Sequence, residues 1–144
     1  MGLKSRSKGK AGEREIASLI ADLTGWDVRR RVRQHEGDSD LEGVPGWSVE
    51  VKRHAQATRA DIRAWWNQTE RQAASEGSLP VLFCRRDRDE WRAVWSLAAM
   101  LSPGDAWSGY AWTVEGSIEA WAAVAASTVI HREPQQNHSE VKND

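Results

Sequence analysis

The chain has 144 residues, of which 40% are hydrophobic and 28% are charged, and its formal net charge at pH 7 is −1. This length predicts one domain with at most a small appendage. The sequence shows no signal peptide and no apolar run near the roughly 18 residues of a membrane span, which excludes an integral membrane protein. Cys84 is the only cysteine, which excludes a disulfide framework and a cysteine-based zinc site and favours a reducing cytoplasm.

The near-neutral total charge hides an asymmetry along the chain. Residues 1–63 hold 13 Lys and Arg against 10 Asp and Glu, whereas residues 64–144 hold 7 against 11. This difference indicates a side of the molecule that faces a polyanion. Residues 1–10 are small, polar and basic, so we expect a flexible N-terminus in which Lys8 and Lys10 contact phosphates. A flexible end without such contacts is the alternative.

A helix is predicted from about Ala11 to Thr24, ended by Gly25. Its apolar residues recur at the helical spacing i, i+3, i+4, i+7, as Ile16, Leu19, Ile20 and Leu23. Glu13 projects from this stripe. A carboxylate on a core-facing stripe is costly unless it is paired or bound to a metal, although the first turn of a helix also favours acids. Both explanations stay open.

The segment from Trp26 to Arg33 alternates between apolar and basic residues and predicts a strand. Trp26, Val28 and Val32 would share one face. The other face would be basic, with Arg29, Arg31 and Arg33. A row of arginines suits a groove that follows a nucleic-acid backbone, and a solvated strand face is the alternative. Residues 34–39 are polar and predict a loop.

The stretch from Asp40 to Lys52, DLEGVPGWSVEVK, organises the chain. Its Pro-Gly pair predicts the turn of a β-hairpin. The period of two along the second arm places Glu50 and Lys52 on one face, with Asp40 near them across the hairpin. Two carboxylates and an ammonium on one sheet face form an oxygen-rich site suited to Mg²⁺. A metal there would bind a phosphate and activate water, which is the layout of a phosphodiesterase.

The Glu-x-Lys spacing carries little information alone, because roughly 0.5 matches are expected by chance in a chain of this length. The hairpin context and Asp40 make the pattern much more specific. The alternative is an ordinary ion pair between Glu50 and Lys52 on a solvated strand.

After the hairpin, Thr58 and Asp61 form a capping-box pattern that predicts a helix to about Glu76, closed by Gly77. Gln68 lies beside the inward stripe of this helix, where it would reach the sheet edge near the site or else point to solvent. Short strands follow at residues 80–86 and 91–96. The element order is therefore α-β-β-β-α-β-β, an α/β fold with a mixed central sheet.

The C-terminal third is less regular. Residues 97–101 predict a helical turn, residues 110–115 a strand, and Ser117 caps a short Ala-rich helix to about Ser127. We expect residues 97–131 to form an extension that packs on the core or joins two subunits, and residues 132–144 to be disordered. The nine tryptophans mostly fall on apolar stripes, which indicates core or interface positions. His54 follows the Lys52 strand and would touch substrate or simply lie at the surface.

These motifs together resemble the PD-(D/E)xK nuclease superfamily. The resemblance is carried by the helix start KGKAGER at residues 8–14, the basic strand, the segment Asp40-Leu-Glu-Gly and the segment Glu50-Val-Lys52. It covers roughly residues 8–95, and it is most similar to archaeal-type Holliday junction resolvases and their small phage-encoded relatives. Ser39 stands where a proline often precedes the aspartate, and Asp38 competes with Asp40 for the same role.

The resemblance implies a restriction-endonuclease-like fold, with a nuclease core at residues 11–96, and a site with defined roles. Asp40, Glu50 and the backbone carbonyl of Val51 would hold one or two Mg²⁺ ions, for which Mn²⁺ would substitute, and Glu13 would support the metal. Lys52 would orient water or stabilise the phosphate. The DNA backbone would be bound by basic and polar side chains: Lys8, Lys10, Arg14, Arg29, Arg31, Arg33 and Gln68.

A resolvase makes two symmetric cuts, so the resemblance also implies a homodimer acting on four-way DNA junctions, in the cytoplasm of a bacterial cell and encoded by the bacterium or a phage. The same chemistry on other DNA, by a nonspecific or structure-selective nuclease, is the first alternative. An inactive DNA-binding or assembly protein on the same fold is the second. Intact Asp40, Glu50 and Lys52 argue against the second alternative.

Overall fold

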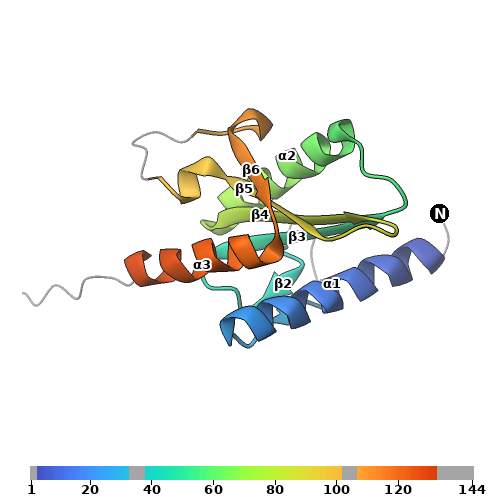
Figure 1. The fold of residues 1–144 in the computed structure, drawn as a ribbon, viewed down its shortest axis with the longest axis horizontal. Coiled ribbons are helices and arrows are strands. Elements are labelled where there is room, and N and C mark those ends of the chain that lie inside the picture. Colours follow the sequence, from blue (N-terminus) through green and yellow to red (C-terminus); the bar gives the residue numbers. More distant parts are fainter. Residues whose placement is uncertain (1–2, 33–37, 102–106, 133–144) are drawn as a thin grey trace, which may run out of the picture.

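The computed structural model describes residues 3–32, 38–101 and 107–132. A four-stranded sheet forms the middle layer, with two helices on one face and one helix on the other (Figure 1). Helices α1 (Leu3–Thr24) and α3 (Ile118–Arg132) lie side by side against one face, and helix α2 (Arg59–Glu76) covers the opposite face. The predicted α/β fold with a mixed sheet is confirmed.

The sheet has the order β3-β4-β5-β6, so that β3 (Trp47–His54) is one of its edge strands. Strand β3 runs parallel to β4 (Leu79–Arg86), and helix α2 makes the crossover between them. Strands β5 (Arg92–Ser96) and β6 (Thr113–Gly116) continue the sheet in antiparallel fashion. The predicted order α-β-β-β-α-β-β is the one observed.

Helix α1 begins at Leu3, so the expectation of a flexible segment before Ala11 is wrong for residues 3–10. Lysine, arginine and leucine favour helix, and the Lys8 ammonium pairs with Asp87 at the end of β4, which anchors this first part of α1 to the sheet. The apolar stripe is buried as predicted at Ile16 and Ile20.

The prediction of a β-hairpin around the Pro-Gly turn is wrong as a strand pair, because the segment before the turn pairs with residues 29–30 and not with β3. Strand β1 (Arg29–Arg30) pairs only with the two-residue strand β2 (Leu41–Glu42), separately from the main sheet. The prediction of a strand over residues 26–33 is therefore wrong at residues 26–28 and 31–32, because β2 offers partners to two residues only. Val28 is buried as expected, whereas Val32 is 68% exposed.

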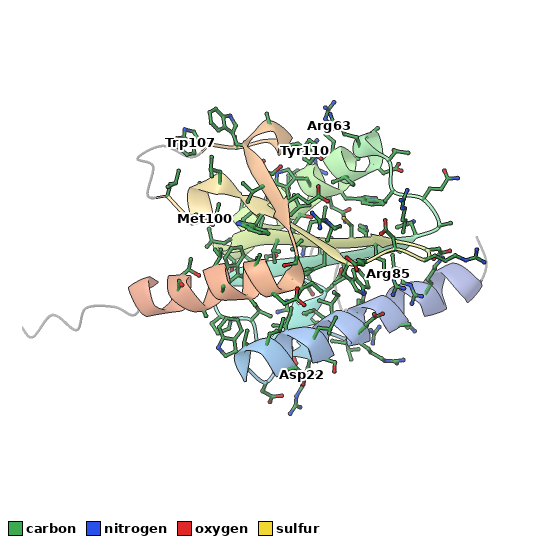
Figure 2. The ribbon with its side chains drawn as sticks, viewed as in Figure 1. Asp22, Arg63, Arg85, Met100, Trp107 and Tyr110 are labelled. Carbon is green, nitrogen blue, oxygen red and sulfur yellow. The ribbon has the colours of Figure 1, made fainter. Side chains whose placement is uncertain are left out.

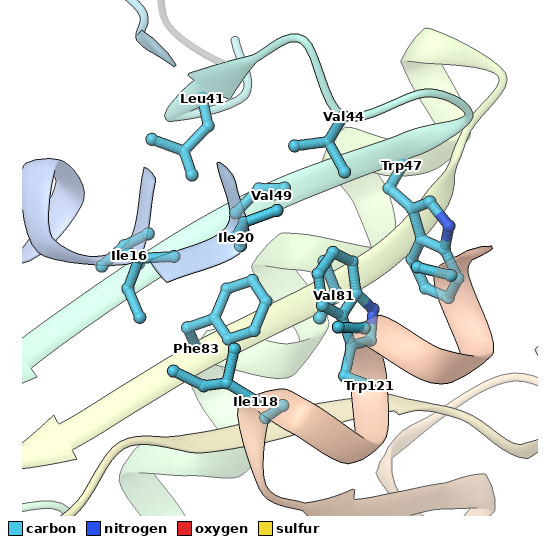
Figure 3. Packing of buried hydrophobic residues seen from close by; sticks show 14 of the residues in the cluster. Ile16, Ile20, Leu41, Val44, Trp47, Val49, Val81, Phe83, Ile118 and Trp121 are labelled. Carbon is cyan, nitrogen blue, oxygen red and sulfur yellow. The ribbon is translucent and has the colours of Figure 1, made fainter. Parts of the chain in front are cut away.

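The larger of two cores lies between the sheet and the helix pair α1 and α3. Ile16 and Ile20 of α1 meet Val49 of β3 and Phe83 of β4 there (Figure 3). Trp121 of α3 is fully buried, and its ring meets those of Trp47 and Phe83 edge-on, at centroid distances of 5.5 and 5.0 Å (Figure 3). The smaller core, on the α2 side, consists of Trp66, Leu82, Cys84 and Val94.

Helix α2 begins and ends as the sequence predicts. The Thr58 side chain accepts a hydrogen bond from the Asp61 amide, and the Asp61 carboxylate accepts one from the Thr58 amide, which completes the capping box. Gly77 ends the helix in the left-handed conformation with φ of 66°. These two ends fix the position of α2 along the sheet.

The C-terminal segment belongs to the same globule. The predicted strand over residues 110–115 is confirmed for residues 113–115, which lie in β6, whereas its first half is a 3-10 turn, η2 (Tyr110–Trp112). Tyr110 lies against α2, where the Arg63 guanidinium sits over its ring (Figure 2). Helix α3 runs past the predicted end at Ser127 to Arg132. The first turn of the segment, η1 (Leu97–Ala99), matches the predicted helical turn.

No helix in the described ranges combines the length and the apolar character needed to cross a bilayer.

The packing of α3 generates a stability prediction. Trp121→Ala removes a fully buried indole from the larger core and is expected to lower the free energy of unfolding by about 3–5 kcal/mol. Urea unfolding followed by circular dichroism measures this loss. The matched control is Trp112→Ala, because Trp112 is 45% exposed. Equal unfolding midpoints for the two variants would contradict a structural role of α3.

Candidate active site at the edge of strand β3

The outer edge of β3 is covered by side chains instead of another strand. The Ser39 hydroxyl, 2% exposed, accepts a hydrogen bond of 2.9 Å from the Val49 amide and donates one to the Leu41 carbonyl. The Asp40 amide donates to the Val49 carbonyl at 2.8 Å. In the sequence Ser39 stands out only as a departure from the family motif, whereas in the structure its hydroxyl satisfies a buried backbone amide.

The Asp40 side chain satisfies the next outward-facing backbone amide of the β3 edge, that of Val51. Its carboxylate oxygen Oδ2 accepts a hydrogen bond of 2.8 Å from the Val51 amide, and the residue is 3% exposed. The N–H and C=O groups of one strand residue point to the same side of the strand. The Val51 carbonyl therefore faces the Asp40 side of β3, away from β4. This arrangement brings the predicted Asp40 and the predicted carbonyl together.

Glu50 and Lys52 lie on the opposite face of β3 from Val49 and Val51, as the period of two predicts. The Lys52 ammonium is 3.1 Å from Glu50 Oε1. The second oxygen, Glu50 Oε2, is buried and has no hydrogen-bond partner among the described residues. Leaving a buried carboxylate oxygen unpaired is costly. An ordinary surface ion pair does not account for this environment.

Glu13 reaches the same region from α1. Its carboxylate forms an ion pair with the Arg30 guanidinium of β1 at 2.6 Å, which satisfies a charge on the buried side of the helix. Within the described residues, no three side chains of His, Cys, Asp or Glu lie close enough to hold a metal ion. The carboxylates of Asp40 and Glu50, with the Val51 carbonyl, therefore remain the candidate ligands.

These groups line one cleft of about 410 Å³ between the start of α1 and the second half of β3. The predicted residues Glu13, Asp40, Glu50 and Lys52 all contribute to it, together with Lys8 and Val51. His54, for which the sequence left a substrate contact or a surface position open, also lines it, and the remaining lining residues were not predicted: Gly9, Arg53 and Ala55. The run Lys-Arg-His at the end of β3 was the sequence signal for the last part of the cleft.

Two glycines of the motifs allow the close packing around the cleft. A Cβ atom on Gly12 would lie 3.2 Å from the Trp91 ring and 3.4 Å from the Arg53 side chain, so Gly12 lets α1 approach the sheet. Gly43 has φ of 86°, and a Cβ atom there would lie 2.1 Å from the Asp27 carbonyl oxygen. Close contacts with neighbouring atoms thus explain why glycine stands at position 12 in AGER and at position 43 in Asp40-Leu-Glu-Gly.

The chain matches, over residues 4–112, the family model described as "Phage putative PDDEXK endonuclease". It belongs to this endonuclease family. The match confirms the superfamily inferred from the motifs. Protein D14 of Escherichia phage T5 is 25% identical over 112 residues, which cover 63% of this chain and 70% of that protein. Hjc, a Holliday junction resolvase of Archaeoglobus fulgidus, aligns with a TM-score of 0.45 and 16% identity over 82% of this chain and 95% of that chain.

The predicted DNA-binding residues of this endonuclease do not all lie at the cleft, and they differ in exposure and in ion-pair partners. Lys8 lines the cleft, whereas Lys10 and Arg14 are exposed on α1 outside it. Arg29 pairs with Asp27, and Arg31 lies 3.8 Å from Glu76. Arg33 lies outside the described residues. A DNA-binding role for these side chains stays a prediction.

Gln68 does not reach the sheet edge as expected. It is exposed on α2 and does not line the cleft of the endonuclease. Gln72, one helical turn later, is buried instead, and its amide lies 3.4 Å from the Ser48 hydroxyl of β3. The difference comes from the rotation of α2 about its axis, which turns Gln72 toward β3.

The donor set in the cleft fits a divalent cation. Hard cations such as Mg²⁺ take oxygen ligands from carboxylates and backbone carbonyls, and Asp40, Glu50 and Val51 supply these types at one strand edge. A cation next to Glu50 would also satisfy its unpaired buried oxygen.

The covering of the β3 edge generates a second prediction. Ser39→Ala leaves the buried Val49 amide without its acceptor, and we expect a loss of roughly 1–3 kcal/mol in the free energy of unfolding. Urea denaturation measures it. Ser127→Ala is the control, because that exposed hydroxyl bonds only within its own helix and should change stability by less than about 0.5 kcal/mol. A Ser39→Ala variant as stable as the control would refute this role.

Proposed function

We propose that this endonuclease is a metal-dependent enzyme that hydrolyses phosphodiester bonds of branched DNA, with a four-way junction as its substrate. The observation that supports metal dependence most strongly is the buried, unpaired Oε2 of Glu50, beside Lys52 in a cleft that Asp40 also lines. A buried carboxylate oxygen without a hydrogen-bond partner has a functional explanation when a cation or a substrate group completes its surroundings.

In this proposal the ligands of Mg²⁺, or of Mn²⁺ in its place, are Asp40, Glu50 and the Val51 carbonyl. The ion, when bound, supplies positive charge next to the scissile phosphate and makes a water molecule more acidic. Asp40 is oriented for this role by the 2.8 Å hydrogen bond from the Val51 amide. Glu13, already paired with Arg30, would support the ion through water.

Lys52 has the position of a group that acts on the substrate directly. Its ammonium is held 3.1 Å from Glu50 and lies at the wall of the cleft, with a side chain that is 21% exposed. A lysine held this way stabilises negative charge that develops on the phosphate oxygens. It also orients the attacking water through a donated hydrogen bond.

The choice of branched DNA rests on the sequence motifs of α1 and β3, which resemble those of archaeal-type Holliday junction resolvases. Lys8 at the cleft, with Lys10 and Arg14 further along α1, would hold the backbone without reading sequence. Two symmetric cuts require two active sites, so the proposal includes a homodimer. Its place of action would be the cytoplasm of a bacterial cell.

The test is cleavage of a labelled four-way junction beside a linear duplex of the same sequence, with and without Mg²⁺. We expect paired, symmetric nicks in the junction that require Mg²⁺. Lys52→Ala and Glu50→Ala should each lower the rate by roughly 10²–10⁴-fold. Glu119→Ala, an exposed change on α3, is the matched control and should cut at the wild-type rate.

Each other outcome has a defined meaning. Equal cutting of both DNAs would keep the active site and reject the junction preference. Binding of DNA without any cutting would reject the enzyme and favour the DNA-binding alternative. Full activity in Glu50→Ala would contradict the assignment of the site.

A further inference from the structure

His54 occupies a defined place at the cleft that the proposed chemistry does not use. It is the last residue of β3, and the period of two places it on the same face as Glu50 and Lys52. It lines the cleft together with these residues. One pleat repeat, about 7 Å along the strand, separates His54 from Lys52.

The imidazole of His54 is held by an aromatic neighbour. It stacks on the indole of Trp65 in α2, with a centroid distance of 4.8 Å and an interplanar angle of 22°. Trp65 itself is half-buried and packs against the smaller core around Trp66. The core therefore holds the indole in place, and the stacked indole orients the imidazole.

The backbone around this pair is fixed as well. The Asp87 amide donates a hydrogen bond of 3.0 Å to the His54 carbonyl, which ties the end of β3 to the end of β4. Only a short connection separates His54 from the capping box of Thr58 and Asp61 that starts α2. The imidazole is thus positioned before any substrate arrives, although the residue remains exposed to the cleft.

The surroundings of this imidazole favour its uncharged form. Partial burial lowers the pKa of His54, and the positive charges of Lys52 on the same strand and Lys8 on α1 lower it further. Asp61 on α2 acts in the opposite direction with a smaller effect than Lys52. A neutral imidazole donates one hydrogen bond from one ring nitrogen and accepts one at the other.

We infer that His54 contacts the DNA backbone at the nucleotide next to the scissile phosphate, by donating a hydrogen bond from its imidazole, and that Trp65 is its positioning residue. This inference rests on the proposed function of the cleft. The contacts of Lys8 and Lys52 with DNA would be ionic. The contact of His54 would be a specific hydrogen bond that is not ionic. The competing view is that His54 merely shields Trp65 from water.

The test is a binding measurement in a Glu50→Gln background, which prevents cutting. Fluorescence anisotropy with a labelled four-way junction gives the Kd at pH 8 over a range of salt concentrations. His54→Ala should weaken binding by roughly three- to tenfold without changing the dependence of log Kd on log salt. Lys8→Ala should instead reduce that slope by about one, because it removes a charged phosphate contact.

Variants of Trp65 distinguish a DNA contact by His54 from a purely structural role, because only a DNA contact makes the affinity for DNA depend on both residues. Trp65→Ala should weaken binding about as much as His54→Ala, and Trp65→Phe, which keeps a stacking ring, should restore most of the affinity. The double variant His54→Ala with Trp65→Ala should bind no worse than either single variant, because the two residues act as one unit. Trp112→Ala, at an exposed aromatic residue that does not line the cleft, should bind like the parent.

The outcomes separate this inference from the proposed function. A His54→Ala variant that binds the junction as tightly as its Glu50→Gln parent overturns the inference and leaves the proposed function intact. Loss of salt dependence in His54→Ala also overturns it, since the contact would then be ionic. A wild type that binds DNA but never cuts overturns the proposed function, and the anisotropy series still decides His54. A wild type without affinity for DNA overturns both.

Discussion

The site depends on how the exposed edge of β3 is satisfied. Edge strands present unpaired backbone groups, and here the first half of β3 is covered by the Ser39 hydroxyl, the Asp40 backbone and the Asp40 carboxylate. A full partner strand would have paired the Val51 amide with a carbonyl and left no room for a carboxylate. Within the described residues no strand pairs with this edge, and the hydrogen bond from the Val51 amide fixes the Asp40 carboxylate, a candidate metal ligand.

Because the cleft lies at an edge of the sheet, residues from both faces reach it. Helix α1 brings Lys8 and Glu13 from one side, and the polar face of β3 brings Glu50, Lys52 and His54 toward the α2 side. The glycine at position 12 allows the close approach of α1. Arg85, on β4, binds Glu15 of α1 and strengthens the same contact from the sheet (Figure 2). Helix α1 and the sheet thus both contribute side chains to the cleft along the edge of β3.

Local patterns in the sequence predicted the parts of this arrangement that local physics decides. The period of two placed Glu50 and Lys52 together, and the capping box and Gly77 located α2 correctly. The features that were missed depend on tertiary contacts. The Lys8–Asp87 pair that anchors the start of α1 joins residues 79 positions apart, and the rotation of α2 that buries Gln72 instead of Gln68 follows from packing on β3. The bond between Ser39 and Val49 required knowing that β3 is an edge strand.

Titration of the purified protein with Mn²⁺ by isothermal calorimetry measures directly whether Glu50 and Asp40 hold a divalent cation. We expect saturable binding to the wild type, and affinity at least about tenfold weaker for Glu50→Gln, which loses a charged ligand. Glu119→Gln, on the exposed side of α3, should bind as the wild type does. Equal binding by the wild type and Glu50→Gln, or no binding by the wild type, would contradict the account.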